Sequence, residues 1–456
     1  MQSQQKELGS FSRPGADSTY DRAIQFLYSQ LPMFSRVGAA AYKPGLDTTL
    51  ELDRIFGHPH TKFKSIHIGG TNGKGSTSHT LAAMLQAQGY KVGLYTSPHL
   101  VDFRERIRVN GEMIPRSAVT DFVQRWNSLK NETLHPSFFE LTMMMAFDWF
   151  ANQNVDYAVI EVGMGGRLDS TNIITPVACV ITNISPDHTQ FLGTTMPAIA
   201  SEKAGIIKHG IPVVIGEAEG EVRQVFERRA AEVGTDIVFA DDEALLRSAH
   251  GTEPSGLDCE AKSLGKFRFA LSGDYQIANA NTLLSAVGML RRCGVHLDDE
   301  AIRRGFAEVE KLTGLRGRWT ILNDRPLAIC DTGHNEAGLR YNMSQLERLI
   351  SHRHGARLRM VMGFVADKAI SHILPLLPRH ALYYITQAAI PRALPAEELY
   401  KLAKANGFDC QLCPTPVEAW RTAMTEASPD DIIYVGGSTF VVADLLAWLD
   451  AGEQIS

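Results

Sequence analysis

The sequence predicts an α/β protein built on parallel β-sheets, and three observations support this fold class. From residue 63 onward, short apolar runs alternate with segments whose apolar residues recur at helical spacing. The runs at 157–160 and 177–184 are largely apolar, as in strands buried on both faces of a parallel sheet. A glycine-rich loop, GGTNGKGS at 69–76, lies between an apolar run and a helical segment. Sheets of this kind place their phosphate-binding loops at such a position.

The individual elements follow this alternation along the first part of the chain. Apolar residues stand at helical spacing within 20–56. Strands are predicted at 66–68 and 92–95, with a helix at 77–88 between them. The Met-containing apolar segment 138–150 is expected to pack in the core, because methionine commonly fills space there.

A domain junction is predicted at 309–319, where the sequence becomes basic and contains glycines. A second set of apolar runs follows it, and strands alternating with helices again indicate a doubly wound sheet. These later strands are predicted at 327–330, 358–362, 382–385 and 432–435. With 456 residues, the chain is long enough for two or three domains.

The composition excludes several classes of function. Lys+Arg (45) and Asp+Glu (51) give a net charge of −6, so no overall positive charge attracts the protein to nucleic acid or anionic membranes. No apolar run of about 18 residues predicts a membrane span, and the N-terminal residues lack the apolar region of a secretory signal. The six scattered cysteines are expected to be reduced, with the cytoplasm as the compartment. For the isolated C-x-x-C of Cys410 and Cys413, structural thiols are favoured over a zinc or redox site.

The loop at 69–76 has the features of a phosphate-binding site. Glycines let backbone N–H groups approach phosphate oxygens, the helix N-terminus adds positive potential, and Lys74 supplies a mobile charge. The loop departs from the common G-x-x-x-x-G-K-[ST] pattern, because Gly75 separates Lys74 from Ser76. A glycine-rich turn with an exposed lysine is the alternative, but the flanking strand and helix favour nucleotide binding. The predicted ATP contacts here are Gly70, Thr71, Asn72, Gly73, Lys74, Gly75 and Ser76.

Three further loops are expected beside the phosphate loop, because the carboxyl ends of parallel strands share one edge of the sheet. They carry Ser97, Glu161 and His188, each after a predicted strand. A hydroxyl and a carboxylate are natural magnesium ligands, and an imidazole is a less usual one. Taken singly, His188 is more often a hydrogen-bonded structural histidine, and Glu161 a helix cap or a partner of Arg167.

Several motifs together resemble one known family. The chain contains, in order, HIGGTNGKGS, YTSPHLVDFRERIRVNG, SFFELT, IEVGMGGRLDSTN, ISPDHTQFLGTT and ASEKAGIIK. Their order and spacing resemble the dihydrofolate synthase/folylpolyglutamate synthase family of the Mur ligase superfamily, from about residue 20 to residue 446. The resemblance implies the Mur ligase architecture, with an N-terminal P-loop NTPase-type domain at 1–312 and a C-terminal Rossmann-like domain at 313–456.

The resemblance also implies roles for single residues. It implies that Ser97, Glu161 and His188 bind magnesium. Lys203, which spacing alone makes a solvated lysine beside Glu202, is implied to be carbamylated and to help hold a second magnesium. The residues implied to be catalytic are Lys74, His188 and Lys203. The residues implied to contact the pterin substrate are Ser137, Phe138, Phe139, Glu140 and Leu168.

Four later residues look like the family's remaining ATP contacts. Asn279 lies in YQIANANTLLSA, and Arg318 lies in GLRGRWT, where the family more often has P-G-R-F. Asp331 and His334 lie in CDTGHNEAG, where the family usually reads D-G-A-H-N-P. The loop therefore lacks the family's proline but keeps the acid and the histidine. Without the resemblance, Asp331 would be a helix cap and Arg318 a surface cation.

The activity implied by the resemblance is an ATP-dependent ligation. The carboxylate of a folate-type substrate attacks the γ-phosphate of ATP, and the amine of L-glutamate then displaces phosphate from the acyl phosphate. Whether dihydropteroate, tetrahydrofolate or both are used stays open. The implied ligands are ATP, Mg²⁺ at two sites, L-glutamate, and folate or dihydropteroate, bound by a monomer.

Three alternatives share parts of this pattern. A Mur ligase acting on a UDP-linked muramyl substrate has the same phosphate loop, but TSPHL and RERIRVNG resemble the folate branch. An NAD-type dehydrogenase would need glycine or alanine at position 168, where the chain has Leu168. A non-enzymatic P-loop regulator would not need a second domain that supplies Arg318 and Asp331.

Overall fold

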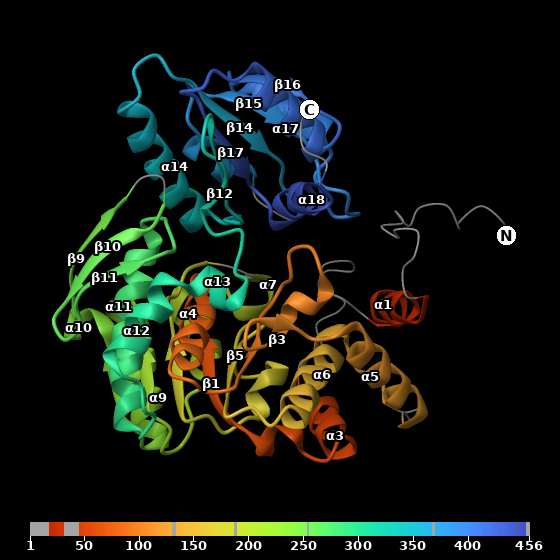
Figure 1. Cartoon of the computed structure of the whole chain (residues 1–456), viewed down its shortest axis with the longest axis vertical. Helices are drawn as coiled ribbons and strands as arrows, with labels where there is room; N and C mark the ends of the chain where they lie inside the picture. The colour runs from red at the N-terminus through yellow and green to blue at the C-terminus, as the bar shows by residue number, and fades with distance from the viewer. Residues whose placement is uncertain are drawn as a thin grey trace.

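The computed structural model describes residues 18–31, 45–129, 134–186, 189–252, 255–366 and 370–452. These residues form a larger and a smaller α/β body, and the smaller C-terminal one lies against one end of the larger (Figure 1). The chain passes from one to the other between α13 (Val309–Thr313) and β12 (Thr320–Asn323). The predicted α/β fold class is therefore confirmed.

The larger body contains a sheet of eight strands in the order β4-β3-β2-β5-β1-β6-β7-β8. Neighbours from β2 to β8 pair in parallel, whereas β3 and β4 add an antiparallel edge. Because β1 lies between β5 and β6, the loop that follows β1 stands in the middle of the carboxyl edge. The strands are β1 Lys64–Gly69, β2 Val92–Tyr95, β3 Ile107–Val109, β4 Glu112–Met113, β5 Tyr157–Glu161, β6 Ala178–Ile181, β7 Val213–Ile215 and β8 Ile237–Phe239.

Helices pack on both faces of this sheet (Figure 1). The helices of the larger body are α1 Ser18–Gln30, α3 Asp47–Ile55, α4 Lys74–Ala87, α5 Arg116–Leu129, α6 Phe138–Asn152, α7 Thr189–Leu192, α8 Met196–Ala204, α9 Gly220–Val233, α10 Ala240–Glu243, α11 Tyr275–Arg292, α12 Asp299–Ala307 and α13. Three short 3-10 helices lie between them: η2 Pro59–Lys62, η3 Phe103–Arg106 and η4 Ser170–Ile173.

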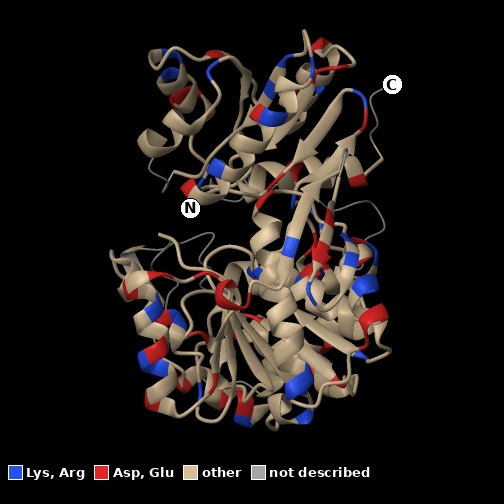
Figure 2. Ribbon diagram, turned by 90° about the vertical axis from the view of Figure 1, so that its left-hand side faces the viewer, with Lys and Arg blue, Asp and Glu red and all other residues tan. Residues whose placement is uncertain are grey.

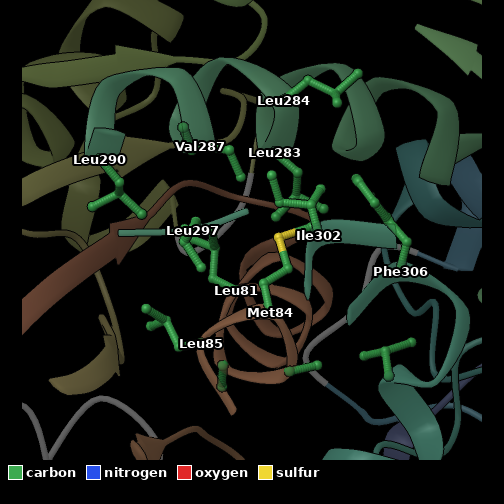
Figure 3. Close-up of a cluster of buried hydrophobic side chains, with 14 of the residues drawn as sticks. Leu81, Met84, Leu85, Leu283, Leu284, Val287, Leu290, Leu297, Ile302 and Phe306 are labelled. Atoms are coloured by element: carbon green, nitrogen blue, oxygen red, sulfur yellow. The ribbon is translucent and has the colours of Figure 1, made fainter. Parts of the chain in front are cut away.

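The helix that follows the phosphate loop, α4, is enclosed between the sheet and two other helices. Its Leu81, Met84 and Leu85 face apolar side chains of α11 and α12 (Figure 3). The two helices α4 and α12 approach closely at Gly305, where an added Cβ would lie 2.4 Å from Met84 Cγ. Burial of this kind holds the N-terminal end of α4 in a fixed position at the carboxyl edge.

The apolar segment predicted to be core forms α6. Met143, Met144 and Met145 are at most 1% exposed and pack with Phe147 and Phe150. The prediction that this methionine-rich stretch is core is confirmed. The helix begins with a capping box, in which the Ser137 hydroxyl accepts from Glu140 N and the Glu140 carboxylate accepts from Ser137 N.

The smaller body contains a six-stranded sheet in the order β12-β13-β17-β14-β15-β16. All neighbours pair in parallel except β12 and β13. The four strands predicted in this region are confirmed. The elements are β12, β13 Leu327–Cys330, β14 Leu358–Met362, β15 Leu382–Ile385, β16 Asp409–Leu412 and β17 Ile432–Gly436, with α14 Glu336–Ser351, α15 Ile370–Ile373, η5 Leu374–Leu376, α16 Ala396–Ala405, α17 Pro416–Glu426 and α18 Thr439–Asp450.

Two features of the fold differ from the sequence prediction. An antiparallel sheet of β9 (Leu246–Gly251), β10 (Leu257–Ala261) and β11 (Gly265–Phe269) was not predicted. Its strands bury one face only, so charged residues interrupt the apolar pattern that marks the parallel strands. The run predicted as a strand at 177–184 leaves the sheet after Ile181. Its next residue, Thr182, instead hydrogen-bonds the phosphate loop, with its hydroxyl donating to Asn72 O.

Charged side chains lie mainly on the outer helices and loops, and the strands of the larger sheet carry few of them (Figure 2). No helix in the described part of the chain is long and apolar enough to cross a membrane. All six cysteines are free. Cys410 packs into the core on one face of the smaller sheet, and Cys413 packs into the core on the other. Thiols on opposite faces do not form a shared site, so the structural interpretation of this C-x-x-C is confirmed.

A buried ion pair in the smaller body is expected to contribute strongly to its stability. Arg359 Nε donates to Asp431 Oδ2 at 2.8 Å, and their side chains are 6% and 2% exposed. We expect Asp431→Ala to lower the free energy of unfolding by about 3–5 kcal/mol, because it removes the buried carboxylate of the pair and leaves Arg359 only the partly exposed carboxylate of Glu426 at 3.4 Å. Asp430→Ala is the matched control. It breaks the exposed Arg325–Asp430 pair and should cost less than about 1 kcal/mol. Equal shifts in urea unfolding curves would contradict the prediction.

Candidate active site

A cleft opens at the carboxyl edge of the larger sheet, and the smaller body forms its opposite wall. On one side it is lined by the phosphate loop and by the loops after β2, β5 and β6. On the other side it is lined by residues 314–316 and 318 of the joining segment, by residues 331–334, by residues 337, 338 and 341 of α14 and by Thr439 of α18. The predicted convergence of these loops on one edge is therefore observed.

The phosphate loop has a backbone that requires glycine at two positions. Gly70 has φ +132° and lies against Thr182, where an added Cβ would come 1.9 Å from Oγ1. Gly73 has φ +84°, and a Cβ there would lie 2.3 Å from Asn279 Oδ1. Few L-residues adopt such φ values. The sequence of the loop thus allows α11 to approach it and places Asn279 against it.

Lys74 begins α4 and folds back over the loop. Its Nζ donates to the carbonyl oxygens of Gly70 at 3.1 Å and Thr71 at 2.9 Å. Both acceptors are loop carbonyls and not carboxylates, so the charge of Lys74 remains available for phosphate oxygens. The helix N-terminus beneath it adds positive potential to the same place.

Glu161 and Ser97 lie together next to this loop. Ser97 N donates to Glu161 Oε2 at 2.8 Å, and Glu161 is only 3% exposed. Burial raises the pKa of the Glu161 carboxyl, while Lys74 and the Ser97 amide act in the opposite direction. A buried carboxylate beside a hydroxyl, with one oxygen held by a backbone amide, fits a hard divalent cation such as magnesium. His188, the third predicted ligand, lies outside the described residues.

Lys203, at the end of α8, is buried, whereas its spacing in the sequence predicted a solvated lysine. It is 5% exposed, and its Nζ donates to Gly70 O at 2.8 Å. The end of α8 approaches the loop after β5 closely, since a Cβ on Gly166 would lie 3.0 Å from Lys203 O. Lys203 therefore stands beneath the phosphate loop. Among the residues that the structure describes, which do not include His188, no three His, Cys, Asp or Glu side chains form a group able to hold a metal.

Arg318, from the segment that joins the two bodies, enters the cleft beside the phosphate loop. A Cβ on Gly75 would lie 3.7 Å from Arg318 Nη2 and 3.8 Å from Glu161 Oε1. The guanidinium of Arg318 from the joining segment, the buried carboxylate of Glu161 and the N-terminus of α4 thus meet at one place. Arg318 is not the surface cation that its sequence context alone suggests.

Asp331 is buried and receives four hydrogen bonds from the protein. Its Oδ2 accepts from Tyr275 Oη at 2.7 Å and from Trp319 N at 2.9 Å. Its Oδ1 accepts from Gly333 N at 2.7 Å and Asn342 Nδ2 at 2.8 Å. Because these donors use most of its acceptor capacity, Asp331 holds the loop at 331–335 in place and connects it to α11 of the larger body.

The same loop brings His334 and Asn335 to the cleft. His334 lines it, with Nδ1 3.0 Å from Thr332 O. Asn335 caps α14 and donates from Nδ2 to Asn72 Oδ1 at 2.9 Å, across the two bodies. Sequence reasoning missed Asn335, although it directly follows His334 in the motif.

Sequence reasoning also missed two residues of α11. Tyr275 donates to Asp331, and Gln276 Nε2 donates to Ser76 Oγ at 3.1 Å while its Oε1 accepts from Asn279 Nδ2 at 2.8 Å. These residues connect the base of the phosphate loop to α11. Their proximity in sequence to Asn279 is the signal that could have identified them.

The predicted substrate residues lie outside the lining of this cleft. Ser137 and Glu140 are occupied in the capping box of α6, and Phe138 is 3% exposed. The Phe139 ring packs on Gly163, where a Cβ would come 2.4 Å from it, and Gly163 does line the cleft. Leu168 is half-buried in the loop after β5. Their contact with a pterin stays a prediction.

Comparison with known families gives two matches along the chain. Residues 68–287 match the family described as the Mur ligase middle domain. Residues 317–439 match the family described as the Mur ligase, glutamate ligase domain. The two matches correspond to the larger sheet with its phosphate loop and to most of the smaller body.

Curated relatives and solved structures extend this similarity over most of the chain. A dihydrofolate synthase/folylpolyglutamate synthase of Bacillus subtilis is 32% identical over 88% of this chain and 94% of its own. A folylpolyglutamate synthase of Lacticaseibacillus casei is 31% identical over 89% and 94%. The structure of E. coli FolC in complex with DHPP and ADP matches with a TM-score of 0.80 and 28% identity, covering 97% of this chain and all of that one. A Yersinia pestis bifunctional synthase complexed with AMPPNP and Mn ion matches with a TM-score of 0.77 and 29% identity, over 96% and 100%.

Proposed function

The chain belongs to the dihydrofolate synthase/folylpolyglutamate synthase family of Mur ligases, and from this premise we propose how its cleft performs the family's reaction. The protein is an ATP-dependent acid–amino-acid ligase that joins glutamate to a folate. The observation that carries the assignment to this cleft is the meeting of Lys74, Glu161 and Arg318 around the phosphate loop.

ATP is proposed to lie along the cleft with its phosphates on the loop. Backbone N–H groups of the loop and the N-terminus of α4 then receive the phosphate oxygens, and Lys74 exchanges its two carbonyl acceptors for them. The nucleoside would extend toward α11 and the smaller body. The ATP contacts proposed outside the loop are Asn279, Arg318, Asp331 and His334. For Asp331 the proposed role is indirect, because protein donors already occupy its carboxylate.

Divalent metal is proposed to be held by Ser97, Glu161 and His188, with Lys203 serving a second ion. A solved relative contains Mn ion together with AMPPNP, which supports a divalent metal beside the nucleotide. When bound there, such a cation would offset phosphate charge and help to orient the γ-phosphate. The buried carboxylate of Glu161 is the strongest support in this chain. It forms no ion pair with a described lysine or arginine, and a buried carboxylate of this kind suits a metal ion as its counter-charge.

The reaction needs no enzyme nucleophile. The folate carboxylate attacks the γ-phosphorus of ATP, so a P–O bond forms as the bond to ADP breaks. The amine of glutamate then adds to the acyl carbon, and phosphate leaves as the amide forms and the amine loses its proton. The chain's part is to hold three anionic reactants in line and to offset the developing charge with Lys74 and Arg318.

Lys203 is proposed to carry a carbamate on Nζ. An unmodified ammonium at this buried place donates to the same Gly70 carbonyl as Lys74 does, so two positive charges share one acceptor. A carbamate on Lys203 would instead bring a negative charge beside the Lys74 ammonium. We expect Lys203→Ala to lower turnover about 10²-fold, with partial rescue by acetate or formate as a replacement anion. An intact mass that shows an unmodified lysine, together with full activity of Lys203→Ala, would remove the carbamate.

The experiment that tests the function is a measurement of ADP release with MgATP and L-glutamate. Dihydropteroate is added in one reaction and tetrahydrofolate in another. Stimulation by both would establish a bifunctional enzyme, and stimulation by one alone would assign that branch. If neither stimulates release but a UDP-linked muramyl substrate does, the folate assignment is wrong.

Three further expectations belong to this proposal. The segment at Ser137–Glu140 and Leu168 is proposed to contact the pterin, since Phe139 reaches the cleft wall at Gly163. The enzyme is proposed to act as a monomer, because both walls of the cleft come from one chain. A reducing cytoplasm is proposed as its compartment, in keeping with its free cysteines.

A further inference from the structure

Arg108, in the middle of β3, is a buried cation that the described residues leave without a carboxylate. It is 8% exposed and lines the cleft. Its Nη1 donates to Gly111 O at 2.8 Å, whereas its buried Nε has no hydrogen-bond partner. The guanidinium lies flat over Gly314, where an added Cβ would come 2.9 Å from Nη1. Burial lowers the pKa of Arg108.

The charges of Glu105, Glu112 and Asp102 act on Arg108, but none of these carboxylates forms an ion pair with it in the described structure. The Glu105 carboxylate accepts from the backbone N–H groups of Leu100, Val101 and Asp102 at 2.7–3.1 Å. The neighbouring cation Arg316 has its own partner, since it forms a two-bond pair with Asp450 at 2.7 and 2.9 Å. A buried charge without a counter-ion costs several kcal/mol. Such a cost in the wall of a cleft is expected where a ligand supplies the counter-ion.

The edge of the guanidinium that could bind a carboxylate is enclosed in this structure, because Nε is buried. A carboxylate would therefore reach this edge only after the side chain turns toward the cleft. Nη1 is occupied by a carbonyl, so the remaining side-on pair of donors is Nε with Nη2. Two parallel N–H groups of this kind bind both oxygens of one carboxylate. On the opposite wall, Thr439 stands at the N-terminus of the 12-residue helix α18 and adds positive potential. This end of the cleft is therefore suited to an anion.

We propose that Arg108 binds the side-chain carboxylate of the incoming amino acid and thereby selects an acid over its amide. This inference rests on the proposed function, because it requires glutamate to enter this cleft. β3, which carries Arg108, pairs with β2, which leads to Ser97. β2 in turn lies between β3 and β5, which ends at Glu161. The amine of glutamate must reach the acyl phosphate, and its side-chain carboxylate is the group that extends furthest from it.

The test compares glutamate with glutamine in wild type and Arg108→Met. Glutamine keeps the shape and the α-carboxylate of glutamate but lacks the side-chain charge. We expect Arg108→Met to raise the KM for glutamate at least about tenfold, because it removes a charge-assisted bidentate contact. The preference for glutamate over glutamine should fall by a similar factor, while the KM values for ATP and the folate stay within about twofold.

Two controls separate binding from folding. Arg104→Met removes a cation of the same segment that is already paired with Asp102 at 2.7 Å, and it should leave the KM for glutamate unchanged. Without substrates, Arg108→Met should melt at the wild-type temperature or above it, because the variant no longer buries an unpaired charge. If Arg108→Met does not fold, Arg108→Lys replaces it. Lysine keeps the charge without the fork and should give an intermediate KM.

The outcomes distinguish this inference from the function on which it rests. If wild type releases no ADP in response to glutamate and any folate, the proposed function fails. If wild type responds and the Arg108 variants keep its KM for glutamate, only the role of Arg108 is overturned. Equal increases of KM for glutamate and glutamine would also overturn it, because Arg108 would then not sense the side-chain charge.

Discussion

Lys74→Ala is expected to lower kcat by about 10²-fold or more, a loss of roughly 2.7–4 kcal/mol of transition-state stabilisation. Lys74 begins α4, and its Nζ reaches only two loop carbonyls, so its charge is free to meet the phosphate oxygens. That charge matters most while the γ-phosphoryl group moves between oxygens, so kcat should fall more than the KM for the folate rises.

The fold should survive this substitution. Lys74 is only half-buried, and the enclosed part of α4 begins at Ser76. Single-turnover formation of ADP is the measurement, with melting temperature as the check on folding. Lys266→Ala, which removes an exposed lysine of β11, is the control and should retain wild-type kcat. Turnover of Lys74→Ala near that of the control would show that Lys74 does not act on the phosphates.

Glu161→Gln should have the second large effect, with about 10²-fold lower turnover at ordinary magnesium concentrations. The substitution keeps the size of the side chain and its ability to accept from Ser97 N. It removes the negative charge that the buried site offers to a cation. Higher magnesium should restore part of the activity, since the loss arises in metal binding and not in folding.

Binding of Mn²⁺, followed by electron paramagnetic resonance in the presence of a non-hydrolysable ATP analogue, measures this effect without turnover. We expect Glu161→Gln to bind at least one Mn²⁺ ion fewer than wild type, or to bind one of them with clearly lower affinity. Glu260→Gln is the matched control, because Glu260 is half-exposed and pairs with Arg247 on the three-stranded sheet. Unchanged Mn²⁺ binding in Glu161→Gln would remove Glu161 from the metal site.

Parallel strands that are buried on both faces were the most predictable elements. β2, β13, β14 and β15 have the predicted bounds, because continuous apolar runs mark strands that are buried on both faces. The three-stranded sheet of β9, β10 and β11 carried no such signal. One of its faces is solvated, and its pairing depends on packing against α12 and not on local composition.

The candidate site was predictable where it follows a strand directly. Ser97 and Glu161 come to one place because β2 and β5 are parallel neighbours, and a sequence pattern already contains that information. Lys203 was not predictable from spacing, since a lysine beside a glutamate on a helix is usually solvated. Its burial arises from the close approach of α8 to the loop at Gly166.

By itself, the sequence determined the fold class, the phosphate loop, and the strand ends that carry the acid and the hydroxyl. Each of these depends on residues close together in the chain. Only the tertiary structure decided that Asn335 reaches Asn72, that Tyr275 holds Asp331, and that Arg108 is left without a counter-ion. These contacts join residues up to 263 positions apart. Their geometry depends on how two separately folded bodies pack, and no local pattern encodes that packing.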